Sequence, residues 1–223
     1  AQVEPRKLLS AVALGAEREG VRFRTGSTVR SVEVSGGRVR GVELADGTLE
    51  GDRVVVAAGS WTTQIPGLPL QPDTIYPVRG QMITTQTRPP LFRRVVFGAG
   101  GYVVTRPHGR VLCGSTMERV GFSRGNTFGG LSDVIDKATR IAPSLREAVV
   151  ESHWSSFRPG TPDGLPLVGE TRVEGLFLAS GHYRNGILLA PLTAELIADA
   201  FHGESDSREA RALSPRRFEE SGT

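Results

Sequence analysis

The sequence predicts a mixed α/β (α+β) protein that combines two kinds of sheet. Two segments with apolar residues at helical spacing, residues 4–19 and 187–197, lie toward either end of the chain. The run of three valines at 54–56 has no polar alternation, which predicts a strand buried on both faces. By contrast, residues 75–117 hold several strand-like runs separated by turn residues, which favours an antiparallel sheet. A chain of 223 residues suffices for one large domain or two small ones.

The first 60 residues are predicted to fold as a helix, a meander of strands and a buried strand. Pro5 suits the first position of a helix, and the apolar residues that follow share one face. These apolar residues are Leu8, Leu9, Val12 and Ala16. Residues 21–24 are predicted as a short strand, and the alternating runs 28–34 and 39–44 flank the hairpin signal Gly36-Gly37.

The remaining elements follow from turn and breaker signals. Residues 66–72, rich in Pro and Gly, predict a crossover, and the strand-like runs after it are 76–85, 94–97, 102–106 and 110–116. A helix is expected over 131–141, and residues 158–166 are predicted as a loop. A short apolar strand at 176–179 then leads through a turn onto the last helix. The polar tail beyond Gly203 is expected to be loosely held, with 213–218 as a segment that docks.

Composition excludes several classes of function. The net charge of +3, without a block of like charges, argues against nucleic-acid binding. Cys113 is the only cysteine, so no internal disulfide or cysteine metal cluster is expected, and the four histidines lack metal-ligand spacing. No transmembrane segment or signal peptide is recognised, which predicts a cytoplasmic protein. The first residue is Ala1 rather than methionine, which suggests a processed or truncated product.

The turn from Gly181 to Gly186 has two interpretations. Backbone N–H groups at a helix N-terminus lack intrahelical partners and the helix dipole is positive there, so an anion or developing negative charge is favoured. Arg184 adds a full positive charge in the same turn. The alternative is a strand–turn–helix that serves only for packing, since a turn flanked by glycines is weak evidence by itself.

Four motifs in order carry a resemblance to a known family. They are Val54–Trp61 (VVVAAGSW), Pro77–Gln81 (PVRGQ), Arg158–Gly164 (RPGTPDG) and Gly181–Ile187 (GHYRNGI). Together they resemble the carboxy-terminal two-thirds of the FAD-dependent D-amino-acid oxidase superfamily. The run that begins at His182 is most similar to glycine oxidases of the thiamine thiazole pathway. The resemblance extends over nearly all of the chain.

The resemblance implies a domain organisation. It implies an incomplete glutathione-reductase-type FAD-binding domain plus an antiparallel-sheet substrate domain. Residues 1–70 and 158–203 would belong to the FAD-binding domain, 71–157 to the substrate-binding domain and 204–223 to the tail. The family begins with a Gly-rich phosphate loop between a strand and a helix, and no Gly-x-Gly-x-x-Gly follows a strand here. We therefore expect a family member without its amino-terminal segment, and FAD binding by this chain alone stays open.

The resemblance also implies a set of substrate-binding residues. Arg158 and Arg184 would bind the substrate carboxylate, because a planar guanidinium presents a fork that matches a carboxylate. Tyr102 would donate its hydroxyl to the same carboxylate, and Met117 would line a small side-chain pocket. From the residues alone, packing roles for Tyr102 and Met117 and a salt bridge for Arg158 are the alternatives.

The cofactor implied by the resemblance is FAD, contacted mainly by backbone. Val29 matches a position near the adenine end, and Gly59 a position after the buried strand. The rest of the implied set, beside the flavin ring, is Gly181, His182, Tyr183, Arg184, Asn185, Gly186 and Ile187. The positive end of the helix that begins near Gly186 would stabilise negative charge on the reduced flavin. No side chain is assigned as catalytic, and no metal is expected.

The implied activity is oxidative deamination of glycine or another small amino acid. The amino acid and oxygen would be the partners, and hydrogen peroxide and an imine or 2-oxo acid the products. A homo-oligomer or a separate amino-terminal segment are further possible partners. Two alternatives remain: a dehydrogenase of the same fold that uses another electron acceptor, or an inactive fragment or subunit that needs the missing part.

Overall fold

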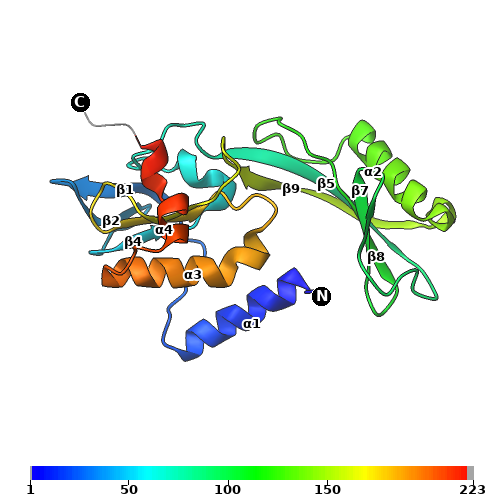
Figure 1. Ribbon diagram of the computed structural model, residues 1–223, viewed down its shortest axis with the longest axis horizontal. Helices are drawn as coiled ribbons and strands as arrows, with labels where there is room; N and C mark the ends of the chain where they lie inside the picture. Colours follow the sequence, from blue (N-terminus) through cyan, green and yellow to red (C-terminus); the bar gives the residue numbers. More distant parts are fainter. Residues whose placement is uncertain (1, 220–223) are drawn as a thin grey trace. The chain divides into compact units, whose positions relative to one another are not determined.

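The structure is a computed structural model that describes residues 2–219. The chain divides into two compact units. The discontinuous unit consists of Ala1–Tyr76 and Pro159–Thr223, and the inserted unit consists of Pro77–Arg158. Figure 1 shows the mixture of helices and sheets in both, which confirms the predicted mixed fold.

The discontinuous unit contains a three-stranded antiparallel meander, whose strands follow one another in the chain. The strands are β1 (Val29–Ser35), β2 (Arg38–Leu44) and β3 (Gly47–Glu50). Gly36 and Gly37 join the first two with φ values of 61° and 74°, as a two-residue hairpin turn with both central residues left-handed requires. The predicted hairpin is confirmed.

A second sheet in this unit has the order β10-β11-β4. Its strands are β10 (Leu167–Glu170), β11 (Leu176–Ser180) and β4 (Val54–Val56), with β11 parallel to β4 and antiparallel to β10. Apolar side chains of this sheet and of the meander form one core together with Ile75, which precedes β5; its members are Val32, Val39, Val56, Ile75, Leu167, Leu176 and Leu178. Helices α3 (Gly186–His202) and α4 (Arg208–Leu213) cover the other face of β10 through Val168, Leu196 and Ala210. Figure 1 shows both helices beside this sheet.

Two predictions about the amino-terminal residues need correction. Val55 was expected to be buried, but its side chain is 39% exposed because α3 packs on β10 and β11 while β4 forms the edge of the sheet. Residues 21–24 form no strand, since they have no strand partner among the described residues. The first helix is confirmed as α1 (Pro5–Arg18), yet none of its residues is buried and Leu9 is 71% exposed.

The inserted unit is built on a five-stranded sheet of order β6-β7-β8-β5-β9. The strands are β5 (Tyr76–Gln86), β6 (Val96–Gly98), β7 (Gly101–Thr105), β8 (Arg110–Gly114) and β9 (Val150–Gly160). The pairs β6–β7, β7–β8 and β5–β8 are antiparallel, as predicted. Helix α2 (Phe128–Ile141) begins after Thr127, whose hydroxyl accepts a hydrogen bond from the Gly130 N–H. It packs on one sheet face in a core of Ile83, Val103, Val111, Cys113, Val134 and Ala138.

Two further predictions about the carboxy-terminal part need correction. Arg158 was expected in a loop but lies near the end of β9, because β9 is the edge strand of its sheet and can therefore continue through Pro159. The tail beyond Gly203 was expected to be loosely held, but α4 buries Ala210 against β10. The docking expected for residues 213–218 is confirmed, since the 3₁₀ turn at Pro215–Phe218 packs Phe218 against the core. The last tail residues, 220–223, lie outside the described part. Within residues 2–219, no helix has the length and apolar character needed to span a membrane.

Candidate substrate face and flavin turn

The sheet face of the inserted unit opposite α2 carries three of the predicted substrate-binding residues. Tyr102 on β7 lies opposite Gly114 on β8, and Gly114 lies opposite Met82 on β5. Side chains directly opposite one another share a face, whereas the alternating neighbours Val103 and Cys113 point into the core beneath α2. We call the face of Tyr102 and Met82 the substrate face.

Arg158 reaches the substrate face beside Gly80, which lies two residues before Met82 on β5. A Cβ atom added to Gly80 would come within 2.3 Å of the Arg158 Nη1 atom, so the guanidinium occupies space that only glycine leaves free. Its Nη2 donates to the Ser115 hydroxyl at 2.7 Å and its Nη1 donates to the Thr116 carbonyl oxygen at 3.3 Å. Both acceptors are neutral.

The charge of Arg158 is therefore available to an external anion. No carboxylate of residues 2–219 forms an ion pair with it, although the side chain is only partly exposed. A partly desolvated guanidinium with neutral partners favours a bound anion, because the local effective dielectric is below that of water. The salt bridge that was the alternative role for Arg158 is thus not formed within the described chain.

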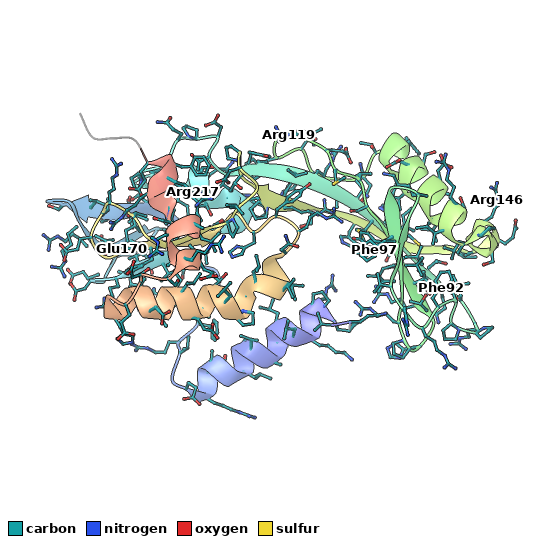
Figure 2. All side chains as sticks on the ribbon, viewed as in Figure 1. Phe92, Phe97, Arg119, Arg146, Glu170 and Arg217 are labelled. Carbon is teal, nitrogen blue, oxygen red and sulfur yellow. The ribbon has the colours of Figure 1, made fainter. Side chains whose placement is uncertain are left out.

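Tyr102 is held by weak contacts that a substrate can replace. Its hydroxyl donates to the Met82 sulfur at 3.2 Å, and a thioether is a weak acceptor. The Phe97 ring, on the neighbouring strand β6 and directly opposite Tyr102, has its centroid 5.7 Å from that of Tyr102. Figure 2 labels Phe97 on this sheet. The Met82 sulfur thus contacts the Tyr102 hydroxyl, and the Phe97 ring packs against the Tyr102 ring.

Met117 follows β8 in a segment that runs alongside β5. Glu118 and Arg79 form an isolated antiparallel bridge, which places Met117 across from Gly80. The Thr116 and Glu118 side chains bond to Gln81 on the α2 side, so alternation directs Met117 to the substrate face, where it is 58% exposed. The structure therefore brings Tyr102, Met117 and Arg158 to one face.

Two glycines of this face were not recognised as site residues from the sequence. Gly80 leaves room for the Arg158 guanidinium, and a Cβ on Gly114 would lie 2.2 Å from the Met82 sulfur and 3.1 Å from the Tyr102 ring. The signal was present, since an isolated glycine within a strand pattern indicates close approach of another group. The identity of the approaching group can be known only from the folded structure.

The candidate flavin residues of the discontinuous unit lie at the end of the β10-β11-β4 sheet where the parallel strands β4 and β11 have their carboxyl ends. The parallel strands β4 and β11 pair Val56 with Leu178, so the chain leaves both strands at the same edge, where open α/β sheets bind ligands. Gly59 and Gly181 each follow three residues later. The Ser180 hydroxyl donates to the Gly59 carbonyl oxygen at 3.0 Å and accepts from the Thr62 hydroxyl at 2.8 Å, which ties the two segments together.

The segment Gly181–Ile187, which we call the flavin turn, reverses direction through left-handed residues. Gly181 has φ = 79°, and a Cβ there would lie 2.7 Å from the Thr161 methyl carbon. Tyr183 has φ = 49°, and its N–H donates to the Pro159 carbonyl oxygen at 2.9 Å. The His182 Nε2 lies 2.8 Å from the Thr193 hydroxyl on α3, and burial lowers the pKa of His182. The turn is therefore fixed to its own helix.

The start of α3 presents backbone rather than a capping side chain. Asn185 is the N-cap residue, but its side chain makes no capping hydrogen bond. Ile187 and Leu188 expose 49% and 79% of their surface. At Gly186 an added Cβ would meet only the His182 Cβ at 3.5 Å, and at Gly59 no atom lies within 4 Å. The helix N-terminus is accessible to a flat or anionic group.

Arg184 and Val29 belong to the discontinuous unit and are not part of the substrate face. Arg184 is exposed on the flavin turn, without an ion-pair partner in residues 2–219. It belongs to the discontinuous unit, whereas Tyr102, Met117 and Arg158 belong to the inserted unit. Val29 lies at the start of β1, in the meander rather than in the sheet that carries the flavin turn.

Comparison with known proteins identifies the class. Residues 1–200 match the family described as DAO, FAD dependent oxidoreductase, and the chain belongs to this family. FAD is the cofactor of this family. The resemblance inferred from the four motifs is thereby confirmed.

Individual members of this family are similar to the chain over most of its length. The chain is 39% identical to the bifunctional protein ThiO/ThiG of Synechocystis sp. over 97% of its length and 33% of that protein's. It is also 39% identical to the glycine oxidase of Pseudomonas putida, over 75% of its length and 46% of that enzyme's. The crystal structure of glycine oxidase from Geobacillus kaustophilus matches with a TM-score of 0.84 and 32% identity, over 93% of this chain and 56% of that one. The chain thus spans about a third to about half of these relatives' length.

The residues at the sheet edge fit the isoalloxazine part of FAD. The open space at Gly59 and Gly186 would let a flat ring approach the backbone, and the uncapped N-terminus of α3 favours negative charge on it. These observations concern the ring, and the pyrophosphate is not assigned to any residue of this chain.

Proposed function

We propose that the complete protein is an FAD-dependent oxidase of glycine or another small amino acid. The observation that carries the proposal is Arg158, a partly buried guanidinium whose partners are the neutral oxygens of Ser115 and Thr116. A group of this kind is suited to a substrate carboxylate, which every amino acid presents. The similarity to glycine oxidases supports the choice of a small amino acid.

The substrate face supplies orientation rather than acid–base chemistry. We propose that Arg158 binds the carboxylate and that the Tyr102 hydroxyl exchanges its contact with the Met82 sulfur for a carboxylate oxygen. Met117 and Phe97 would limit the size of the substrate side chain. Holding the substrate in one orientation removes much of the entropic barrier to reaction. Arg184 stays a prediction as a second carboxylate ligand.

The flavin turn would hold the cofactor ring. Gly59, Gly181–Ile187 and the N-terminus of α3 would contact the isoalloxazine, and Val29 stays a prediction for the adenine end. Bound FAD supplies the oxidising chemistry, since it accepts the hydride that leaves the amine-bearing carbon. In the proposed overall reaction the amino acid becomes an imine, water hydrolyses the imine to a 2-oxo acid and ammonia, and oxygen is reduced to hydrogen peroxide. The settings in thiamine biosynthesis and in the cytoplasm remain predictions.

Absorption spectroscopy of the full-length protein with FAD tests the proposal. We expect flavin absorbance that bleaches with glycine under anaerobic conditions and returns with air, together with peroxide formation. Arg158→Ala should retain flavin and lose glycine binding, whereas Arg146→Ala, at an exposed arginine of the same unit (Figure 2), should behave as wild type. Unchanged turnover and KM in Arg158→Ala would contradict the carboxylate assignment. Bleaching without oxygen consumption would instead favour a dehydrogenase.

A further inference from the structure

A buried polar network lies behind the substrate face, on the side of α2. It consists of Arg79, Gln81, Thr116 and Glu118, which we call the anchor network. Arg79 is 5% exposed, Gln81 is fully buried and Thr116 is 5% exposed. Such groups are rarely buried without a reason, because desolvation is costly unless each is hydrogen-bonded.

The network is centred on the Glu118 carboxylate. It accepts from the Arg79 Nε at 3.2 Å, from the Gln81 Nε2 at 2.8 Å and from the Thr116 hydroxyl. Burial by itself would raise the pKa of Glu118, but the hydrogen bonds from Thr116, Arg79 and Gln81 and the charge of Arg79 outweigh burial and lower the pKa. The carboxylate is therefore ionised at neutral pH.

The network also fixes backbone. The Arg79 N–H donates to the Glu118 carbonyl oxygen at 2.9 Å and the Glu118 N–H donates to the Arg79 carbonyl oxygen at 3.0 Å. The Gln81 N–H donates to the Thr116 hydroxyl at 2.9 Å, and the Gln81 Oε1 accepts from the Thr127 N–H at 2.9 Å. The segment 115–118 is thus attached to β5, and Gln81 attaches β5 in turn to the start of α2.

This anchored segment supplies both hydrogen-bond acceptors of the Arg158 guanidinium. The Ser115 hydroxyl and the Thr116 carbonyl oxygen hold Nη2 and Nη1, and both residues are buried. The Thr116 side chain bonds to the anchor network, while its carbonyl oxygen bonds to Arg158. Thr116 therefore connects the network to the guanidinium through one residue.

We infer that Thr116 and Glu118 are positioning residues for the carboxylate site, acting through the two acceptors that orient Arg158. The inference rests on the proposed function of Arg158. A guanidinium forms two parallel hydrogen bonds with a carboxylate only in one orientation, and the 115–118 segment sets that orientation in advance. Loosening the segment weakens carboxylate binding and leaves the reaction of bound substrate largely unchanged.

Thr116→Val tests the inference, because it removes the connecting hydroxyl and leaves the Arg79–Glu118 ion pair in place. Its matched control is Thr105→Val in the same unit, where the threonine is equally buried and its hydroxyl has no hydrogen-bond partner. Thr116→Ser keeps the hydroxyl and should restore wild-type behaviour. The probe is acetate, the simplest carboxylate, with its affinity for the full-length protein followed by ligand-observed NMR of the acetate methyl signal.

We expect Thr116→Val to weaken acetate binding about tenfold, as the loss of one hydrogen bond that organises a charged site would produce, with no change in Thr105→Val. With glycine as substrate, KM should rise by a similar factor while kcat stays within about twofold. A purely structural role would instead lower the fraction of folded protein, reducing apparent kcat at constant KM. If Thr116→Val does not fold, Glu118→Gln provides the second variant, with the same direction expected.

The outcomes separate the two proposals. Wild-type acetate affinity in Arg158→Ala would overturn the proposed function itself. Loss of acetate binding in Arg158→Ala, together with wild-type affinity in Thr116→Val and Glu118→Gln, would overturn the positioning role and leave the function standing.

Discussion

Replacing Gly80 by alanine should stabilise the folded protein and at the same time impair substrate binding. The added Cβ would lie 2.3, 2.4 and 2.6 Å from the Nη1, Nη2 and Cζ atoms of Arg158, whereas ordinary contact begins at 3.4 Å. The guanidinium must therefore retreat by about 1 Å, which a long flexible side chain can do at little cost in stability.

The two effects have different sizes. Gly80 is not among the glycines with positive φ, so alanine fits the backbone and should stabilise the fold by up to about 1 kcal/mol. A displacement of about 1 Å at a group that orients the substrate lowers kcat/KM by about 100-fold. Thermal melting of the full-length protein measures the first effect, and steady-state kinetics with glycine measures the second.

Gly129→Ala is the matched control. Gly129 lies in α2, where an added Cβ meets no atom within 4 Å, so this variant should be stabilised by about 1 kcal/mol with unchanged kinetics. Wild-type KM and kcat in Gly80→Ala, with melting confirming a folded protein, would show that the position of Arg158 does not control substrate binding, and our reasoning would be refuted.

Three further predictions concern stability and reactivity. Burial raises the pKa of Glu219 above its ordinary value near 4.5, against the Arg172 N–H and charge, so the folded state holds this proton more tightly and loses stability as pH rises through that range; Glu219→Gln should become increasingly more stable than wild type as pH rises above about 4.5 in chemical denaturation, and a constant difference would contradict this. Burial raises the pKa of the Cys113 thiol to about 11, so a thiol reagent at pH 8 should react with this residue only after denaturant is added. Rapid labelling of the native protein would show that Cys113 is accessible. The Arg217 Nε donates to the Asp163 carboxylate at 2.7 Å. Burial would raise the pKa of Asp163, but the hydrogen bonds from Arg217 and from the Leu165 N–H lower it, so the stabilisation is present above the ordinary carboxyl pKa and is lost as pH falls. Asp163→Asn should therefore speed amide hydrogen exchange in residues 208–218 at pH 7, and unchanged exchange would show that the pair does not hold the tail.

Local patterns predicted most elements because local physics decides them. The helix over residues 5–18, the Gly36-Gly37 hairpin and the helix that begins at Gly186 each follow from spacing and turn chemistry. Burial was harder to predict, since it depends on neighbours that the pattern does not contain. Val55 has the residues of a covered strand around it, yet it lies on the edge strand of its sheet.

The candidate site likewise has residues that local motifs predict and partners that only the fold reveals. The motifs led to Arg158, Tyr102 and the flavin turn, but not to their partners. Ser115 lies 43 positions from Arg158 in the chain, and Gly80 lies further still, so only the pairing of β5, β8 and β9 brings them together. Contacts of this kind depend on strand register, which spacing within one segment cannot reveal.

The inserted unit begins on β5 and ends on β9, and these strands are neighbours in its sheet. An insert whose two ends lie side by side can be exchanged for another without redirecting the chain that flanks it, which is why domain insertions are tolerated at such places. The inserted unit is therefore a replaceable module that carries the substrate face, while the sheet bearing the flavin turn is built from strands outside it. Exchanging this insert with that of a relative would change the substrate face and leave the sheet that bears the flavin turn as it is.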